Sequence, residues 1–183
     1  MPHIKLSTDF PGIRSLMIFR PQTSTPLNML AQILLFDENS LSRGERELIA
    51  TYVSHLNGCV YCESTHGAIA KHHLGNNAEL VKNVISDPEH ADVSDKLKAL
   101  LQIAGKVQQG GKKVTSIEIE NAKANGATDI EIHDTVLIAA AFCMYNRYVD
   151  GLGTLIPDDP AVYDKIGKQR SAEGYMTAPV KLK

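Results

Sequence analysis

The chain has 183 residues, 43% of them apolar, and a formal charge of only -2. This length predicts a single domain over residues 1–183 with one buried core. A pI near 6.4 and the absence of tryptophan argue against a nucleic-acid surface. No run approaches the roughly 20 apolar residues that cross a bilayer, and the first residues lack a long apolar segment. We therefore expect a cytoplasmic protein without membrane contact.

The first 26 residues predict an extended or turn-rich N-terminal arm, because they hold four of the eight prolines. No sustained apolar period runs through this arm. Ile13, Leu16 and Phe19 are nevertheless too apolar for a free tail. We expect the arm to pack on the body of the protein or on a neighbouring subunit.

Helix start and stop signals fill the middle of the chain. Ser42 and Glu45 have the spacing of a capping box, apolar residues follow at helical intervals, and Asn57-Gly58 ends the run. A second helix then carries two cysteines as far as residues 74–75. The same signals predict helices over about 76–85, 94–107, 115–124 and 128–151. No comparable series of strands is present, so we predict an all-α fold with a C-terminal extension over about 155–183.

Cys59 and Cys62 form a CxxC motif, and His66 follows four residues later. The spacing fits a two-electron dithiol/disulfide couple. In a cytosolic protein a lone CxxC is more often redox-active or metal-binding than structural. A helical wheel places Cys62 and His66 on one inward face, within relay distance of each other. At Cys59, the unpaired N–H groups of the helix start favour a thiolate.

Glu47 is the candidate partner of His66. If the short turn at residues 57–58 makes its two helices antiparallel, Glu47 lies close to His66. A carboxylate there could orient the imidazole and complete a proton relay to Cys62, direct or through one water. The apolar face of the first helix lies opposite Glu47, so amphipathicity alone would leave this side chain in solvent. Its neighbours Ala50, Thr51 and Ser54 are small enough for a second close helix contact.

Residues 46–50 and 57–62, together with His66, resemble the AhpD-like alkylhydroperoxidase group of the carboxymuconolactone decarboxylase superfamily. The signature of that group is a glutamate twelve residues before a CxxC and a histidine four residues after it. Glu47, Cys59, Cys62 and His66 match it. Residues 10–12, 19–21 and 142–153 resemble the peroxidase-related branch.

The resemblance implies a helical bundle built around the CxxC hairpin, assembled as a homo-oligomer, usually a trimer or hexamer. It implies the reduction of a hydroperoxide substrate, in which Cys62 attacks, Cys59 resolves the sulfenic acid as a disulfide, and His66 and Glu47 relay protons. No organic cofactor is needed, and a dithiol electron-donor protein or a small thiol would return the electrons. Some members carry a second relay histidine directly before the second cysteine. This chain has Tyr61 there, a poor base near neutral pH, which lowers the turnover that we expect.

Three alternatives stay open. A redox-sensing or binding module would form the disulfide reversibly without peroxidase turnover. A carboxymuconolactone decarboxylase-type enzyme would share the fold, but members named for that activity lack this CxxC. A zinc module needs four ligands, and Cys59, Cys62 and His66 supply three of them. The fourth would come from elsewhere, such as His55 or His133.

Overall fold

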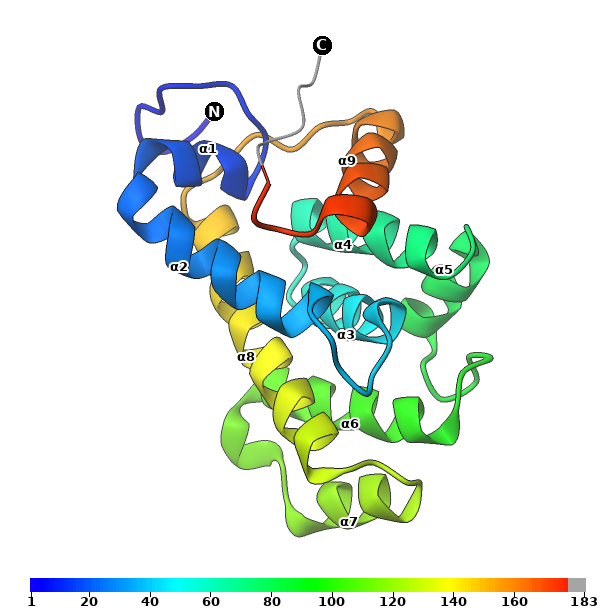
Figure 1. Cartoon of the computed structure of the whole chain (residues 1–183). Helices are drawn as coiled ribbons and strands as arrows, with labels where there is room; N and C mark the ends of the chain where they lie inside the picture. The colour runs from blue at the N-terminus through cyan, green and yellow to red at the C-terminus, as the bar shows by residue number, and fades with distance from the viewer. Residues whose placement is uncertain (178–183) are drawn as a thin grey trace.

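The computed structural model describes residues 1–177, where all regular secondary structure is helical and no strand occurs (Figure 1). This confirms the predicted all-α fold. None of the helices in this range is long and apolar enough to span a membrane. The assignment of residues 1–183 to one domain stays a prediction.

The helices are α1 (Ile13–Phe19), α2 (Pro21–Ala31), α3 (Arg43–Leu56), α4 (Val60–His73), α5 (Ala78–Ser86), α6 (Asp95–Gln109), α7 (Ser116–Ala124), α8 (Asp129–Gly151) and α9 (Pro160–Glu173), with a π-helical turn η1 (Gln32–Phe36) and a 3-10 turn η2 (Gly111–Lys113).

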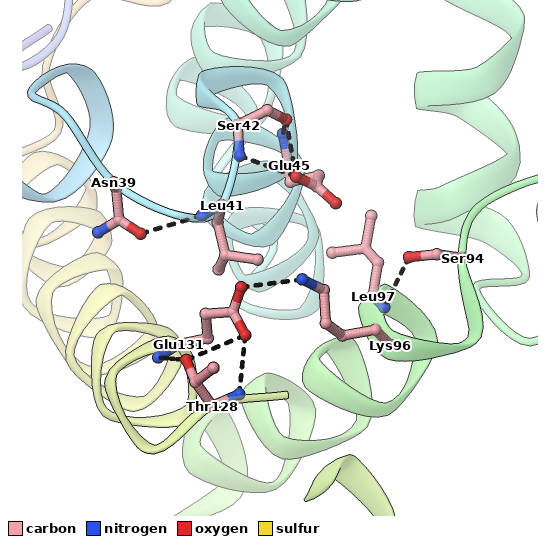
Figure 2. Close-up of polar contacts among 9 residues, drawn as sticks. All are labelled: Asn39, Leu41, Ser42, Glu45, Ser94, Lys96, Leu97, Thr128 and Glu131. Atoms are coloured by element: carbon pink, nitrogen blue, oxygen red, sulfur yellow. Dashed lines mark hydrogen bonds and ion pairs between the residues drawn. The ribbon is translucent and has the colours of Figure 1, made fainter. Parts of the chain in front are cut away.

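The predicted helix starts carry the side-chain caps that the sequence indicated. The Ser42 hydroxyl accepts the backbone N–H of Glu45, and the Glu45 carboxylate accepts the Ser42 N–H at 2.8 Å. Thr128 and Glu131 repeat this box at the start of α8, where Lys96 also lies 2.8 Å from Glu131 (Figure 2). These caps give partners to backbone donors that have none inside a helix. Helices α3 and α8 therefore begin where the sequence predicted.

The start of α5 differs from the prediction by two residues. Asn76 has a left-handed φ of 66°, which ends the turn after α4. Asn77 takes over the capping role and accepts the backbone N–H of Leu80 at 2.9 Å. The helix therefore begins at Ala78 rather than at residue 76.

Helix α3 lies at the centre of the molecule and packs against α4, α6 and α8. Ile49, Leu100 and Ile138, one from each of α3, α6 and α8, are fully buried in the shared core. Burial of each such side chain contributes about 1.5–3 kcal/mol. Helix α8 runs from α7 at one end of the fold to α1 at the other (Figure 1). The core thus holds α3 rigidly from several sides.

Side-chain hydrogen bonds tie the turn between α3 and α4 to α8. Gly58 supplies the positive φ of 70° that the tight turn needs. Asn57 donates to Oδ1 of Asn146 at 2.8 Å, and the buried Asn146 amide donates to the Ser54 hydroxyl at 3.1 Å. These bonds hold the turn on α8, and the antiparallel packing of α3 on α4 brings Glu47 opposite the CxxC helix.

The N-terminal arm is helical where an extended arm was predicted. Residues 13–19 form α1 and residues 21–31 form α2, so the prediction of an extended arm through residue 26 is wrong beyond residue 12. Pro21 occupies the first position of α2, where no N–H is needed, and Pro26 removes only one helical hydrogen bond. Leu16 and Met17 are buried, as we expected for an arm packed on the body.

The C-terminal extension contains a helix that was not predicted. Asp159 caps α9 and Pro160 occupies its first position, a start signal that the sequence contains. Helix α9 packs closely on α4, because a Cβ at Gly167 would lie 2.8 Å from the backbone of Ala68. After Gly174 the chain turns back over the CxxC hairpin (Figure 1). The end of the predicted extension, residues 178–183, lies outside the described residues.

Candidate active site

The two cysteines of the CxxC face the interior, as the helical wheel predicted. Cys59 is the N-cap of α4 and is fully buried, and Cys62 in the first turn is 4% exposed. Both are free thiols. They form a small apolar cluster with Tyr61, Val149 and Tyr163, which come from α4, α8 and α9. The dithiol therefore lies where three helices meet.

The Cys59 thiol holds its proton in a network that the sequence did not reveal. Its sulfur lies 3.2 Å from Oδ1 of Asp150, to which the thiol donates. A hydrogen bond with Cys62, burial and the bond to Asp150 together raise the pKa of Cys59 well above its ordinary value. The expectation that the helix start favours a thiolate at Cys59 is therefore wrong. The hydrogen bond with Cys62, burial and, to a smaller extent, the Asp150 carboxylate outweigh the helix dipole at this position.

Glu47 and His66 meet as the register argument predicted. Nδ1 of His66 lies 2.8 Å from Oε2 of Glu47, and the Glu47 side chain is 1% exposed. Amphipathicity alone would have placed Glu47 in solvent, but the close contact of α3 with α4 buries it. The contact with Glu47 engages Nδ1, so Nε2 is the ring nitrogen of His66 that remains to exchange a proton.

Tyr175 completes this pair and was missed by the sequence analysis. Its hydroxyl donates a short hydrogen bond to Oε1 of Glu47 and lies 3.4 Å from Nδ1 of His66. Burial and the neighbouring Glu47 raise the pKa of Tyr175 well above its ordinary value, so the tyrosine stays a donor. Phe142 packs edge-on against the imidazole, with ring centroids 4.6 Å apart. His66 is thus held from several sides.

Tyr61, which stands where some relatives have a histidine, is buried in the wall of the site. Its ring packs against the backbone of Gly12, where an added Cβ would lie 2.0 Å from the ring. Burial raises the pKa of Tyr61 well above 10, so it does not act as a base near neutral pH. Tyr61 therefore joins the N-terminal segment to α4 rather than extending the proton relay.

A pocket opens onto Cys62 and His66. It offers about 80 Å³ to the centres of water-sized molecules. Cys59 and Glu47 do not line it, so Cys62 is the sulfur that a small molecule in the pocket would meet. The polar residues Arg14, Tyr61, Thr65, Arg170 and Tyr175 also line it. The remaining lining is apolar except for Asn28 and comes from the N-terminal segment and helices α1, α2, α4, α8 and α9: Phe10, Pro11, Ile13, Met17, Leu27, Ala31, Ile69, Phe142, Tyr145 and Ile166.

The histidines considered as a fourth zinc ligand lie with other partners. Nδ1 of His55 is 3.2 Å from Glu63, and Nδ1 of His133 is 2.9 Å from Asp134. Within residues 1–177, no three or more histidine, cysteine, aspartate or glutamate side chains are grouped so that they could hold a metal ion. Neither histidine therefore joins Cys59, Cys62 and His66.

Comparison with known proteins relates the segment that carries this site to one protein family. The model of the carboxymuconolactone decarboxylase family matches residues 21–87, which include Glu47, both CxxC cysteines and His66. No curated protein is significantly similar in sequence.

Two solved structures share the fold. One is the alkylhydroperoxidase AhpD core of an uncharacterized peroxidase-related protein from Ralstonia eutropha JMP134, with 26% identity, a TM-score of 0.76, and coverage of 86% of this chain and 81% of that one. The other is an uncharacterized peroxidase-related protein from Silicibacter sp. TM1040, with 24% identity, a TM-score of 0.75, and coverage of 84% and 78%. Together the family match and the shared fold support membership of the AhpD-like carboxymuconolactone decarboxylase superfamily, in its peroxidase-related branch.

Proposed function

We propose that the protein reduces hydroperoxides with the Cys59/Cys62 dithiol, assisted by His66 and Glu47. One observation carries the proposal: Cys62 lines a pocket together with His66, whose imidazole is held 2.8 Å from a buried carboxylate. A positioned base beside a thiol is the arrangement that activates a sulfur nucleophile. The Cys59 thiol, whose pKa is raised, keeps its proton in the reduced protein, which leaves Cys62 as the sulfur that attacks first.

The reaction proceeds in two steps that balance. His66 takes the proton of the Cys62 thiol, and the thiolate attacks the outer peroxide oxygen. The O–O bond breaks, Cys62 becomes a sulfenic acid, and the leaving alkoxide takes the proton from His66. Cys59 then attacks the sulfenic sulfur, and hydroxide leaves as water with the Cys59 proton. The hydroperoxide is reduced to an alcohol, and an external thiol or dithiol returns the disulfide to two thiols.

The burial of both sulfurs favours small reactants. Cys59 is fully buried and Cys62 is 4% exposed, so a folded protein surface cannot approach either sulfur directly. A hydroperoxide can reach Cys62 through the pocket. The reductant would be a small thiol, or a donor protein that presents its dithiol on a narrow arm. Such cycling suits a reducing compartment, and we propose the cytoplasm.

Tyr61 favours a second candidate function, a redox sensor without rapid turnover. The position that holds a second relay base in some relatives is occupied here by a buried tyrosine with a raised pKa. A single base could support slow oxidation to the disulfide while turnover stays low. Reversible disulfide formation with no sustained peroxide consumption would favour this function over the peroxidase.

The test is stopped-flow oxidation by an organic hydroperoxide, with thiol counting, for wild type, Cys59→Ser and Cys62→Ser. We expect loss of two thiols in wild type, a trapped sulfenic acid in Cys59→Ser and little reaction in Cys62→Ser. The half-buried Cys143 gives the control, because Cys143→Ser should behave as wild type. The reverse pattern would exchange the two cysteine roles, and the absence of oxidation in every form would remove the peroxidase proposal.

We further propose that the protein acts as a homo-oligomer. Ile130, Leu137 and Met144 lie seven residues apart along α8, and each is between 37% and 57% exposed. An exposed apolar stripe of this kind suits contact with a second copy of the chain. Light scattering should give a mass above 20.0 kDa for wild type and a lower mass for Leu137→Glu. A monomeric wild type would contradict the proposal.

A further inference from the structure

The wall of the pocket carries two guanidinium groups. Arg14 of α1 and Arg170 of α9 both line the pocket that opens onto Cys62. No aspartate or glutamate of residues 1–177 lines it. Glu47, the buried carboxylate of the relay, is bound by His66 and Tyr175 and does not line the pocket. The pocket therefore combines positive charge with a mostly apolar lining.

The two guanidinium groups differ in how they are held. Nη1 of Arg170 donates to the backbone carbonyl of Gly174 at 2.9 Å and to the Thr177 hydroxyl at 2.8 Å. The Arg14 guanidinium makes no hydrogen bond or ion pair within residues 1–177, although its side chain is half-buried. Buried charges are normally paired, because removal from water without a partner is costly. An unpaired cation in the wall of a pocket points to an anionic ligand.

The groups around Arg14 do not neutralise it. Burial and the neighbouring Arg170 lower the pKa of Arg14 to about 10, and Tyr61 alone acts in the opposite direction. Tyr61 is itself neutral near pH 7, because burial raises its pKa. Arg14 therefore keeps its charge at neutral pH, and a bound anion would stabilise that charge.

We propose that Arg14 binds the carboxylate of a short, acidic organic hydroperoxide and directs its peroxide group towards Cys62. This inference rests on the proposed function and names the substrate class for the same site. A guanidinium matches a carboxylate with two parallel hydrogen bonds. The space open to the centres of water-sized molecules is about 80 Å³. A chain of a few carbons fits this room better than a long acyl chain. The carboxylate of the substrate takes no part in bond breaking, so the two chemical steps of the proposed function are unchanged.

The test compares 4-hydroperoxy-4-methylpentanoate with its methyl ester, which differ in one charge. Stopped-flow thiol oxidation at pH 7 gives a rate constant for each, and the acid-to-ester ratio is the quantity of interest. We expect a ratio of about ten or more in wild type, a fall of about tenfold in Arg14→Gln, and a partial ratio in Arg14→Lys. The exposed Arg20, in the linker between α1 and α2, is the matched control, and Arg20→Gln should keep the wild-type ratio. A wild-type ratio near one, or an unchanged ratio in Arg14→Gln, would overturn the inference.

A binding measurement separates this inference from the proposed function. The alcohol 4-hydroxy-4-methylpentanoate cannot oxidise a thiol, so calorimetry reports its binding whether or not the protein is a peroxidase. We expect its Kd to rise tenfold or more in Arg14→Gln and to rise with added salt. If neither hydroperoxide oxidises the thiols, the proposed function fails while the anion site is still tested. If both oxidise them equally and Arg14→Gln binds the alcohol as wild type does, the anion site alone fails.

Discussion

The two sides of the pocket hold their polar groups in opposite ways. On the α3–α4 side, Glu47 contacts both His66 and Tyr175, so each group of the relay has a fixed protein partner. On the α1 part of the lining, Arg14 makes no hydrogen bond or ion pair within residues 1–177. The relay side is preorganised before any substrate arrives, which is what proton transfer requires. The Arg14 side has an unused charge, which is what ligand recognition requires.

The difference follows from how each side is built. The relay side belongs to the α3–α4 hairpin, in which α3 packs against α6 and α8 in the core. The other part of the lining, called the wall here, comes from both ends of the chain: from α1 and α2, and from α9 with Tyr175. Tyr175 is the point where the wall touches the relay. Three substitutions test how far the two sides depend on each other.

The largest effect on stability is expected at Gly12, where the N-terminal wall meets the CxxC helix. Gly12 has a φ of 55°, and a Cβ would lie 2.0 Å from the ring of Tyr61. Gly12→Ala should cost about 2–5 kcal/mol of unfolding free energy, from backbone strain and overpacking. Urea unfolding measures this change in unfolding free energy. Gly151→Ala is the control, because no atom lies within 4 Å of a Cβ there, and its change should stay below about 1 kcal/mol. Equal effects of the two substitutions would show that the wall does not pack tightly on α4.

Tyr175→Phe should have an intermediate effect, and it tests the contact between wall and relay. The buried Glu47 carboxylate would lose a donor, which should cost about 1–3 kcal/mol of unfolding free energy. The pH at which thiol oxidation reaches half its maximal rate should also move, because Tyr175 positions the Glu47–His66 pair. The hydroxyl of Tyr148 makes no hydrogen bond within residues 1–177, so Tyr148→Phe should leave both quantities unchanged. An unmoved pH profile in Tyr175→Phe would confine Tyr175 to a structural role.

The smallest effect concerns Tyr145, which ties α8 to the wall by donating to the backbone carbonyl of Leu27 at 2.9 Å. Burial raises the pKa of Tyr145 from 10.0 to about 12. The unfolded chain ionises this group first, so its stabilisation is present below pH 10 and is lost as the pH rises through 12. Between pH 9 and pH 11.5, the unfolding free energy measured with urea should therefore fall less in Tyr145→Phe than in wild type. An equal fall of the unfolding free energy in both proteins would contradict the raised pKa of Tyr145.

The hairpin was predictable from sequence because its signals are local. The capping box at Ser42, the turn at residues 57–58 and the CxxC spacing each lie within one or two helical turns. The pairing of Glu47 with His66 needed only the antiparallel register of two neighbouring helices. Asp150 and Tyr175 could not be predicted, because they reach the site from 91 and 128 residues away in the chain. No local pattern marks either contact.

The N-terminal arm was mispredicted for a different reason. A proline breaks a helix only in its interior, and Pro21 stands at the first position of α2, where its missing N–H costs nothing. The Asp159-Pro160 start of α9 offered the same signal and was overlooked. At Cys59 the hydrogen bond with Cys62, burial and the Asp150 carboxylate outweigh the helix dipole and raise the pKa, and only the fold brings burial and Asp150 to the thiol.

The central claim is that a Glu47–His66 pair activates Cys62, and the reactivity of a His66→Ala protein tests it most directly. Stopped-flow oxidation by a neutral hydroperoxide at pH 7 should be about 100-fold slower in His66→Ala than in wild type, and added imidazole should restore part of the rate through the space left in the pocket. A His66→Ala protein that reacts as fast as wild type would contradict the account.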